Sequence, residues 1–186
     1  MDIVSKIEKL ASESDFSEYG YVNVETLKYY EEVRKIYEGN SCRNYGASWA
    51  CPPAIGTIAE CAERIGHYNT MLLFSKKYEL EDSFDFESMA AGLKDFKHTV
   101  DLFQQKADDI LSAYLLLSNE SCGRCPACTY PNAPCRFPHL LHHSLEGYGF
   151  IVKELADEAG IQYTNGPNTV TYFGALLFSG NKLKIR

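Results

Sequence analysis

The sequence contains no long hydrophobic run and no strong concentration of basic residues. No stretch of 18 or more apolar residues occurs, so we do not expect the chain to span a membrane. Its 18 Lys and Arg stand against 25 Asp and Glu, a formal net charge of −7. Nucleic-acid binding needs a local cluster of Lys and Arg, and only residues 181–186 are locally basic. We therefore expect neither a membrane nor a nucleic acid as partner.

Several familiar catalytic and nucleotide-binding motifs are also absent. The chain has no G-x-G-x-x-G after a predicted strand, no P-loop and no G-x-S-x-G motif. Its first residues resemble an amphipathic helix and not the basic start of a secretory signal. We expect a cytoplasmic protein with a single domain over residues 1–186. Within it, residues 1–39 would form an N-terminal appendage and residues 40–180 the metal-binding α/β core.

Cysteine is the residue type that stands out. Four of the seven cysteines fall within fourteen residues, spaced C-x₂-C-x₂-C-x₆-C, at Cys122, Cys125, Cys128 and Cys135. In a reducing compartment such thiols are better read as metal ligands than as disulfides. A 4Fe–4S cluster accepts a thiolate at each of several corners, and a short cysteine run can supply them. The spacing therefore predicts an iron–sulfur centre.

Zinc is the alternative metal. Structural zinc sites usually present two separated C-x₂-C pairs, whereas three cysteines share one short run here. The last gap is longer than in the bacterial ferredoxin pattern, which weakens that comparison. The spacing favours iron–sulfur over zinc, and zinc over disulfides or free thiols.

A second group comprises Cys42, Cys51 and Cys61, with gaps of eight and nine residues. One interpretation is that these thiols hold a second cluster or extend the first site. The other is that they are small buried hydrophobic residues. We favour ligation for Cys42 and Cys51 and leave Cys61, inside a predicted helix, open. A cubane bound by three thiolates would leave one iron open to water, substrate or His67, as in a catalytic site.

Other residues near the cysteines are candidates for cofactor binding. Trp49 lies two residues before Cys51 and would shield a cluster from water; the alternative is ordinary core packing. Arg124 and Arg136 adjoin the cysteine run and would offset the charge of a thiolate-bound cluster or donate hydrogen bonds to sulfur. The alternative for both arginines is an exposed position on a polar loop.

Hydrophobic spacing predicts an α/β or α+β fold. We expect a small mixed sheet of three to five strands, helices packed on it, and the cysteine-rich loops at one end. The predicted strands cover residues 19–24, 70–80, 113–118 and 169–179, and the predicted helices cover 2–12, 26–38, 58–67, 89–110, 138–148 and 152–159. The helix at 138–148 would carry His139, His142 and His143, of which we expect two to face solvent and one could relay protons.

The two cysteine boxes together resemble an uncharacterised family of predicted metal-binding proteins. The boxes read Cys42-x-Asn-Tyr-Gly-x-Ser-Trp-x-Cys-Pro-Pro and Cys122-x₂-Cys-x₂-Cys-x₆-Cys-Arg-x-Pro138. Members are small, prokaryotic, frequent in anaerobes and of unknown biochemical function. The resemblance covers about residues 40–178 and implies a cytoplasmic iron–sulfur protein whose two boxes share one functional region. Members often carry an additional cysteine near Cys42, where this chain has Arg43 and Asn44.

Three functions fit these observations. The first is a 4Fe–4S protein that exchanges electrons with a redox partner protein. The second is an iron–sulfur enzyme with an open iron position that reduces or desulfurates a small molecule. The third is an interaction module stapled by zinc. The sequence leaves the oligomeric state open, a homo-oligomer included.

Overall fold

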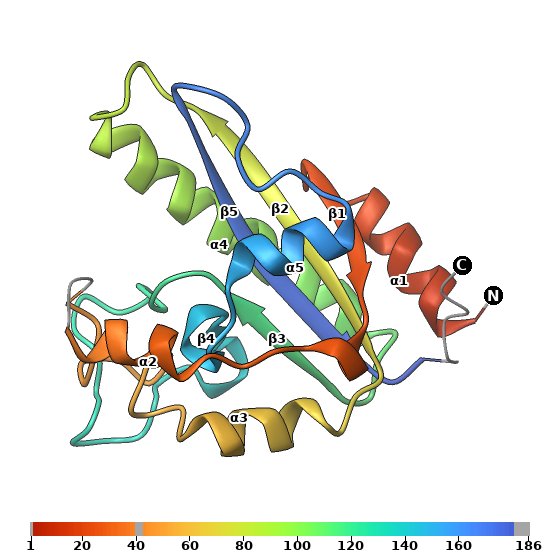
Figure 1. Cartoon of the computed structure of the whole chain (residues 1–186), viewed down its shortest axis with the longest axis horizontal. Coiled ribbons are helices and arrows are strands. Elements are labelled where there is room, and N and C mark those ends of the chain that lie inside the picture. The colour runs from red at the N-terminus through yellow and green to blue at the C-terminus, as the bar shows by residue number, and fades with distance from the viewer. Residues whose placement is uncertain (1, 40–42, 181–186) are drawn as a thin grey trace.

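The fold is built on a five-stranded mixed sheet in the order β1-β2-β5-β3-β4 (Figure 1). The computed structural model describes residues 2–39 and 43–180. The strands are β1 Glu18–Val22, β2 Thr70–Glu79, β3 Tyr114–Ser118, β4 His143–Ser144 and β5 Thr169–Phe178. Neighbouring strands are antiparallel except β3 and β4, which pair in parallel. The mixed sheet with its helices confirms the predicted fold class.

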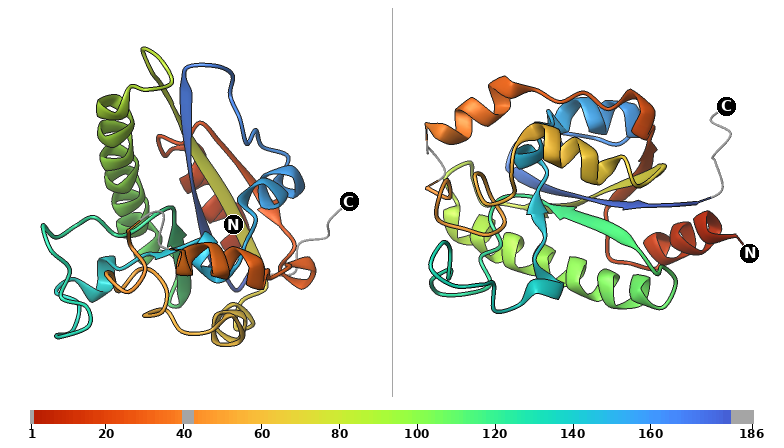
Figure 2. Two further views of the ribbon diagram at one scale, coloured as in Figure 1. Left: turned by 60° about the vertical axis from the view of Figure 1, so that its left-hand side comes forward. Right: turned by 90° about the horizontal axis from the view of Figure 1, so that it is seen from below.

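Helices cover both faces of this sheet (Figure 2). They are α1 Ile3–Ser12, α2 Glu31–Glu38, α3 Ile58–Ile65, α4 Phe86–Asp108 and α5 Val152–Ala159, with short 3₁₀ helices η1 Val24–Thr26, η2 Pro138–Leu140 and η3 Glu146–Tyr148. The helices α1 and α4 pack on one face, and α3, α5 and η3 pack on the other. Within the described residues, no helix is both long and apolar enough to cross a membrane.

The central strands are apolar on both sides because each face is covered. In β2, Leu72 and Phe74 pack toward α4, while Met71 and Leu73 pack toward α3 and α5. Such two-sided burial explains why the strand reads as a continuous apolar run and not as an alternating pattern. Burying each side chain of this size contributes about 1.5–3 kcal/mol. The strand therefore anchors both layers.

The predicted helix over residues 26–38 is wrong at its start. Thr26 ends the 3₁₀ helix η1, and α2 begins only at Glu31. Between them, the backbone N–H of Tyr30 donates to the carbonyl of Gly149 at 2.8 Å. This long-range bond takes up a donor in a segment where the periodicity indicates a helix, so tertiary contact overrides the local pattern.

The predicted helix over residues 138–148 is also wrong. The segment forms η2, the short strand β4 and η3. Its backbone bonds to other elements: the N–H of Ser144 donates to Ala50 O at 3.0 Å, and that of Leu145 to Ser118 O at 2.8 Å. The burial of its histidines differs from expectation as well, because His139 is exposed, His143 half-buried and His142 buried.

Candidate metal centre

The four cysteines of the run line one cavity. Strand β3 ends at Ser118 and continues into the loop of residues 119–137, which lies at one end of the molecule (Figure 1). A cavity of about 150 Å³ in this region is lined by Cys122, Cys125, Cys128 and Cys135, together with Ser48, Trp49, Arg124 and Arg136. None of the six cysteines that the structure describes is in a disulfide. The loop thus brings four thiols to one small space.

The loop of residues 43–56 forms the opposite wall of the cavity. The indole Nε1 of Trp49 donates to the carbonyl of Ala133 at 3.1 Å. The same indole packs edge-on against Tyr130, with ring centroids 4.9 Å apart. Two loops far apart in sequence therefore meet at the cysteines, and Trp49 lies half-buried between them.

Two arginines fix the far end of loop 43–56. Arg34 on α2 donates to the carbonyls of Gly147 and Gly56, and Arg64 on α3 donates to the carbonyl of Ile55. Each guanidinium joins the loop end to a helix, and Arg34 ties it to η3 as well. These bonds anchor the end of the loop that carries Ser48 and Trp49.

Several hydrogen-bond donors surround Cys128. Burial raises the pKa of its thiol, but hydrogen bonds from the backbone of Tyr130 and Trp49 and from the Ser48 hydroxyl outweigh burial, so the pKa falls below its usual value. Donors directed at sulfur favour the thiolate, which is the form that binds metal. These donors therefore favour the metal-binding form of the Cys128 side chain.

Cys135 has a donor of its own. The backbone N–H of Phe137 donates to the Cys135 sulfur at 3.4 Å. Arg136 lines the same cavity and its Nη1 donates to the carbonyl of Ala127 at 2.9 Å, which closes the loop between the third and fourth cysteines. Four thiols, amide donors to sulfur and two neighbouring guanidinium groups are a donor set that fits an iron–sulfur cluster.

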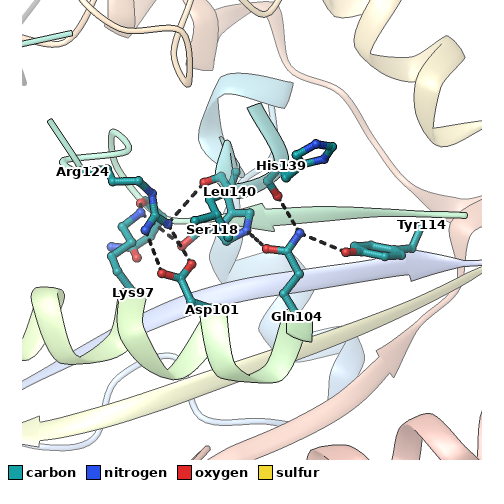
Figure 3. A network of polar contacts seen from close by, with 10 residues as sticks. Lys97, Asp101, Gln104, Tyr114, Ser118, Arg124, His139 and Leu140 are labelled. Atoms are coloured by element: carbon teal, nitrogen blue, oxygen red, sulfur yellow. Dashed lines mark hydrogen bonds and ion pairs between the residues drawn. The ribbon is translucent and has the colours of Figure 1, made fainter. Parts of the chain in front are cut away.

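One face of α4 holds the cysteine run in place (Figure 3). Asp101 accepts two hydrogen bonds from Arg124, at 2.9 and 2.8 Å. One turn earlier, Lys97 donates to the Ser118 hydroxyl at 3.2 Å and to the carbonyl of Asn119. Hydrogen bonds to Asp101 raise the pKa of Arg124 most, burial opposes them, and Cys122 adds to the rise. The guanidinium thus remains charged beside the first cysteine.

Gln104, the next polar residue on that face, holds the segment after Cys135. Its Nε2 donates to the Tyr114 hydroxyl at 2.9 Å and to the carbonyl of His139 at 2.7 Å (Figure 3). Its Oε1 lies 2.7 Å from Nε2 of His142, so the network assigns the imidazole proton to that nitrogen. Burial lowers the pKa of His142 to about 4. The segment is therefore fixed by a neutral histidine.

Sequence reasoning missed this α4 platform. Lys97, Asp101 and Gln104 are spaced four and three residues apart, which places them on one face of a helix. The apolar spacing of this helix predicts only its buried face. The spacing of Lys97, Asp101 and Gln104 is the sequence signal that predicts the platform.

Cys61 lies apart from the cavity. It is fully buried on α3, and its thiol donates to the carbonyl of Ile55 with Sγ and O 3.6 Å apart. Arg64 Nη1 lies 3.6 Å from the same sulfur and also donates to the Tyr148 hydroxyl at 2.8 Å. Burial raises the pKa of the Cys61 thiol. These contacts are those of a packed core residue.

The remaining predicted ligands are not brought to the cavity either. Cys51 is buried in loop 43–56 and does not line the cavity. Burial lowers the pKa of Lys97, and the charges of Cys122 and Cys51 both act to raise it. His67 is exposed after α3. Cys42 lies outside the described residues. Across residues 2–39 and 43–180, no three Cys, His, Asp or Glu side chains are grouped to hold a single metal ion.

A family model described as predicted metal-binding protein (DUF2284) matches residues 20–178. The chain belongs to this family. The match spans the whole sheet except the first two residues of β1, both cysteine-containing loops and the α4 platform. Metal binding is the property that the family description gives, and it specifies no metal. No curated protein and no solved structure matches the chain.

Proposed function

We propose that this protein binds a 4Fe–4S cluster through Cys122, Cys125, Cys128 and Cys135 and acts in electron transfer. The observation that carries the proposal is the convergence of these four thiols on one cavity. A cubane takes one thiolate at each of four irons, so four thiols around one space are the set that it requires.

The spacing of the cysteines supports a polynuclear cluster over a single zinc ion. Structural zinc sites usually present two separated C-x₂-C pairs, whereas Cys122, Cys125 and Cys128 share one run. A cluster binds each thiolate at a different iron, which suits such a run.

The position of the site supports exchange of electrons with a partner protein. Cys128 is exposed, and Cys122, Cys125 and Cys135 are half-buried. A bound cluster would supply reversible one-electron chemistry close to the protein surface. The chain's own groups would bind it through sulfur, offset its negative charge through Arg124 and Arg136, and tune its potential through donors to sulfur.

Low-temperature EPR of anaerobically purified protein tests this function. Titration with dithionite should produce the signal of a reduced 4Fe–4S cluster, and an added one-electron acceptor should remove it. The variant Cys128→Ser should lose the signal, while Cys61→Ala, which changes a cysteine outside the cavity, should keep it. Iron-loaded protein that dithionite does not reduce would contradict electron transfer.

A further inference from the structure

Helix α4 contacts the chain on both sides of the first cysteine of the run (Figure 3). Lys97 donates to the last residue of β3 and to the residue after it, shortly before Cys122 in the chain. Asp101 binds Arg124, shortly after Cys122. A cavity of about 460 Å³ between α4 and this part of the loop is lined by both Lys97 and Cys122. The ammonium-bearing side chain and the first thiol of the run therefore share one space.

Lys97 is a cation without a carboxylate partner at ion-pair distance among the described residues. Arg124 differs, because both of its Nη atoms bond to Asp101 and much of its charge is already balanced. Lys94 and His98 line the same cavity but are exposed, so water screens their charges. The positive charge of Lys97 is thus the one at this cavity that is both shielded from water and unbalanced by an ion pair.

The surroundings of Lys97 disfavour a positive charge unless a negative charge lies near. The side chain is half-buried, and burial lowers the pKa of its ammonium. Among the charges that oppose this effect, Cys122 comes first, followed by Glu120, Glu146 and Cys51. A charged group withdrawn from water needs such compensation. The Cys122 thiolate, with the cluster that it would bind, is therefore the main negative partner available to Lys97.

A fixed positive charge acts unequally on the two oxidation states of a cluster. Four thiolates give a 4Fe–4S cluster a net negative charge, and reduction adds one electron to it. Coulomb attraction to a nearby cation therefore stabilises the reduced state more than the oxidised state. Net charge is one of the factors that set the reduction potential of such clusters.

We propose that Lys97 is the fixed counter-ion of the cluster and raises its reduction potential. This inference rests on the 4Fe–4S cluster proposed above and adds a residue that lies in neither cysteine box. The two hydrogen bonds to the end of β3 hold the ammonium in one place beside Cys122. On reduction, one electron passes from the redox partner to the cluster, and Lys97 remains an ammonium without transferring a proton.

Midpoint potentials from EPR-monitored redox titration, at one pH and salt concentration, test the proposal on anaerobic, cluster-loaded protein. Lys97→Met removes the charge at similar side-chain length. It should make one-electron reduction about tenfold less favourable, a shift of about 59 mV to lower potential. Lys97→Arg keeps the charge and should stay near the wild-type potential. The matched control Lys106→Met removes an exposed charge on α4 outside the cavity and should leave the potential unchanged.

A wild-type potential in Lys97→Met would overturn the proposal. An equal downward shift in Lys97→Arg would also overturn it, because the loss would then come from the side-chain contacts and not from the charge. Lys97→Gln keeps a hydrogen-bond donor without the charge, should shift as Lys97→Met does, and decides the test if Lys97→Met does not load a cluster.

Iron and sulfide content of the wild type separates this proposal from the proposed function. A wild type without a cluster would overturn both. A loaded cluster whose potential does not respond to the charge at position 97 would overturn the role of Lys97 alone.

Discussion

At the scale of single residues, cysteines that look alike in sequence have opposite surroundings. Cys128 is exposed and receives donors from two backbone groups and the Ser48 hydroxyl. Cys61 is buried in the core and contacts Ile55 and Arg64. The first environment stabilises a thiolate and the second stabilises a thiol.

Paired substitutions should separate these two environments. Cys128→Ser should lose most bound iron because a cluster corner loses its thiolate. Cys61→Ala should retain iron but lower the free energy of unfolding by about 1 kcal/mol, the cost of a small core deletion. Iron per chain and urea unfolding measure the two effects. Loss of iron in Cys61→Ala would show that this cysteine is a ligand.

His142 should make stability depend on pH. Its pKa in the folded chain is lowered from 6.5 to about 4 by burial, so the unfolded chain binds the proton more readily. The contribution of the neutral histidine is present above pH 6.5 and is lost as the pH falls toward 4. The loss amounts to as much as about 3 kcal/mol.

The variant His142→Gln should therefore show a smaller loss of unfolding free energy over that pH range than the wild type. Acid-driven loss of metal affects both proteins, so the difference between them reports the histidine. His98→Gln changes an exposed histidine on α4 and should behave as the wild type does. Identical pH dependence in His142→Gln and wild type would contradict the account.

At the scale of secondary-structure elements, α4 supports the candidate metal centre. Its apolar side, including Phe96, Val100 and Phe103, is buried against the sheet. Its polar side holds the loop through Asp101 and the segment after Cys135 through Gln104. One helix thus connects the hydrophobic core to both ends of the cysteine run.

Breaking the bond between α4 and the loop should destabilise the site. Asp101→Asn removes the charge that faces Arg124 in a pair whose side chains are 16% and 23% exposed. We expect a loss of about 2 kcal/mol of unfolding free energy and faster release of metal to a chelator. Asp157→Asn breaks an ion pair with Lys153 that is 60% and 59% exposed and should cost less than about 1 kcal/mol. Equal effects of the two substitutions on stability and metal release would show that the bond between α4 and the loop does not hold the site.

The elements differ in how far their sequence predicts them. Helix α4 was predicted because apolar residues recur at helical spacing along its length, and strand β2 was predicted from its continuous apolar run at residues 71–74. The structure of the segment 138–148 was not predicted, because its central residues Ser144 and Leu145 bond to loop 43–56 and to β3. Partners distant in sequence leave no local period, so a two-residue parallel strand such as β4 cannot be read from spacing.

At the scale of the whole molecule, the sheet brings two loops to one end (Figure 2). The fold class and the position of the cysteine loop after a strand followed from hydrophobic patterning. The meeting of loop 43–56 with the cysteine run was implied by the family resemblance and not by hydrophobic patterning, because it rests on contacts of Trp49 with Ala133 and Tyr130, far apart in sequence.

The central claim is that four thiols around one cavity hold an iron–sulfur cluster. Its most direct test is the content of iron, zinc and acid-labile sulfide per chain in protein purified without oxygen. About four irons and four sulfides per chain is the predicted result. About one zinc and no sulfide would contradict the account and indicate a structural zinc site.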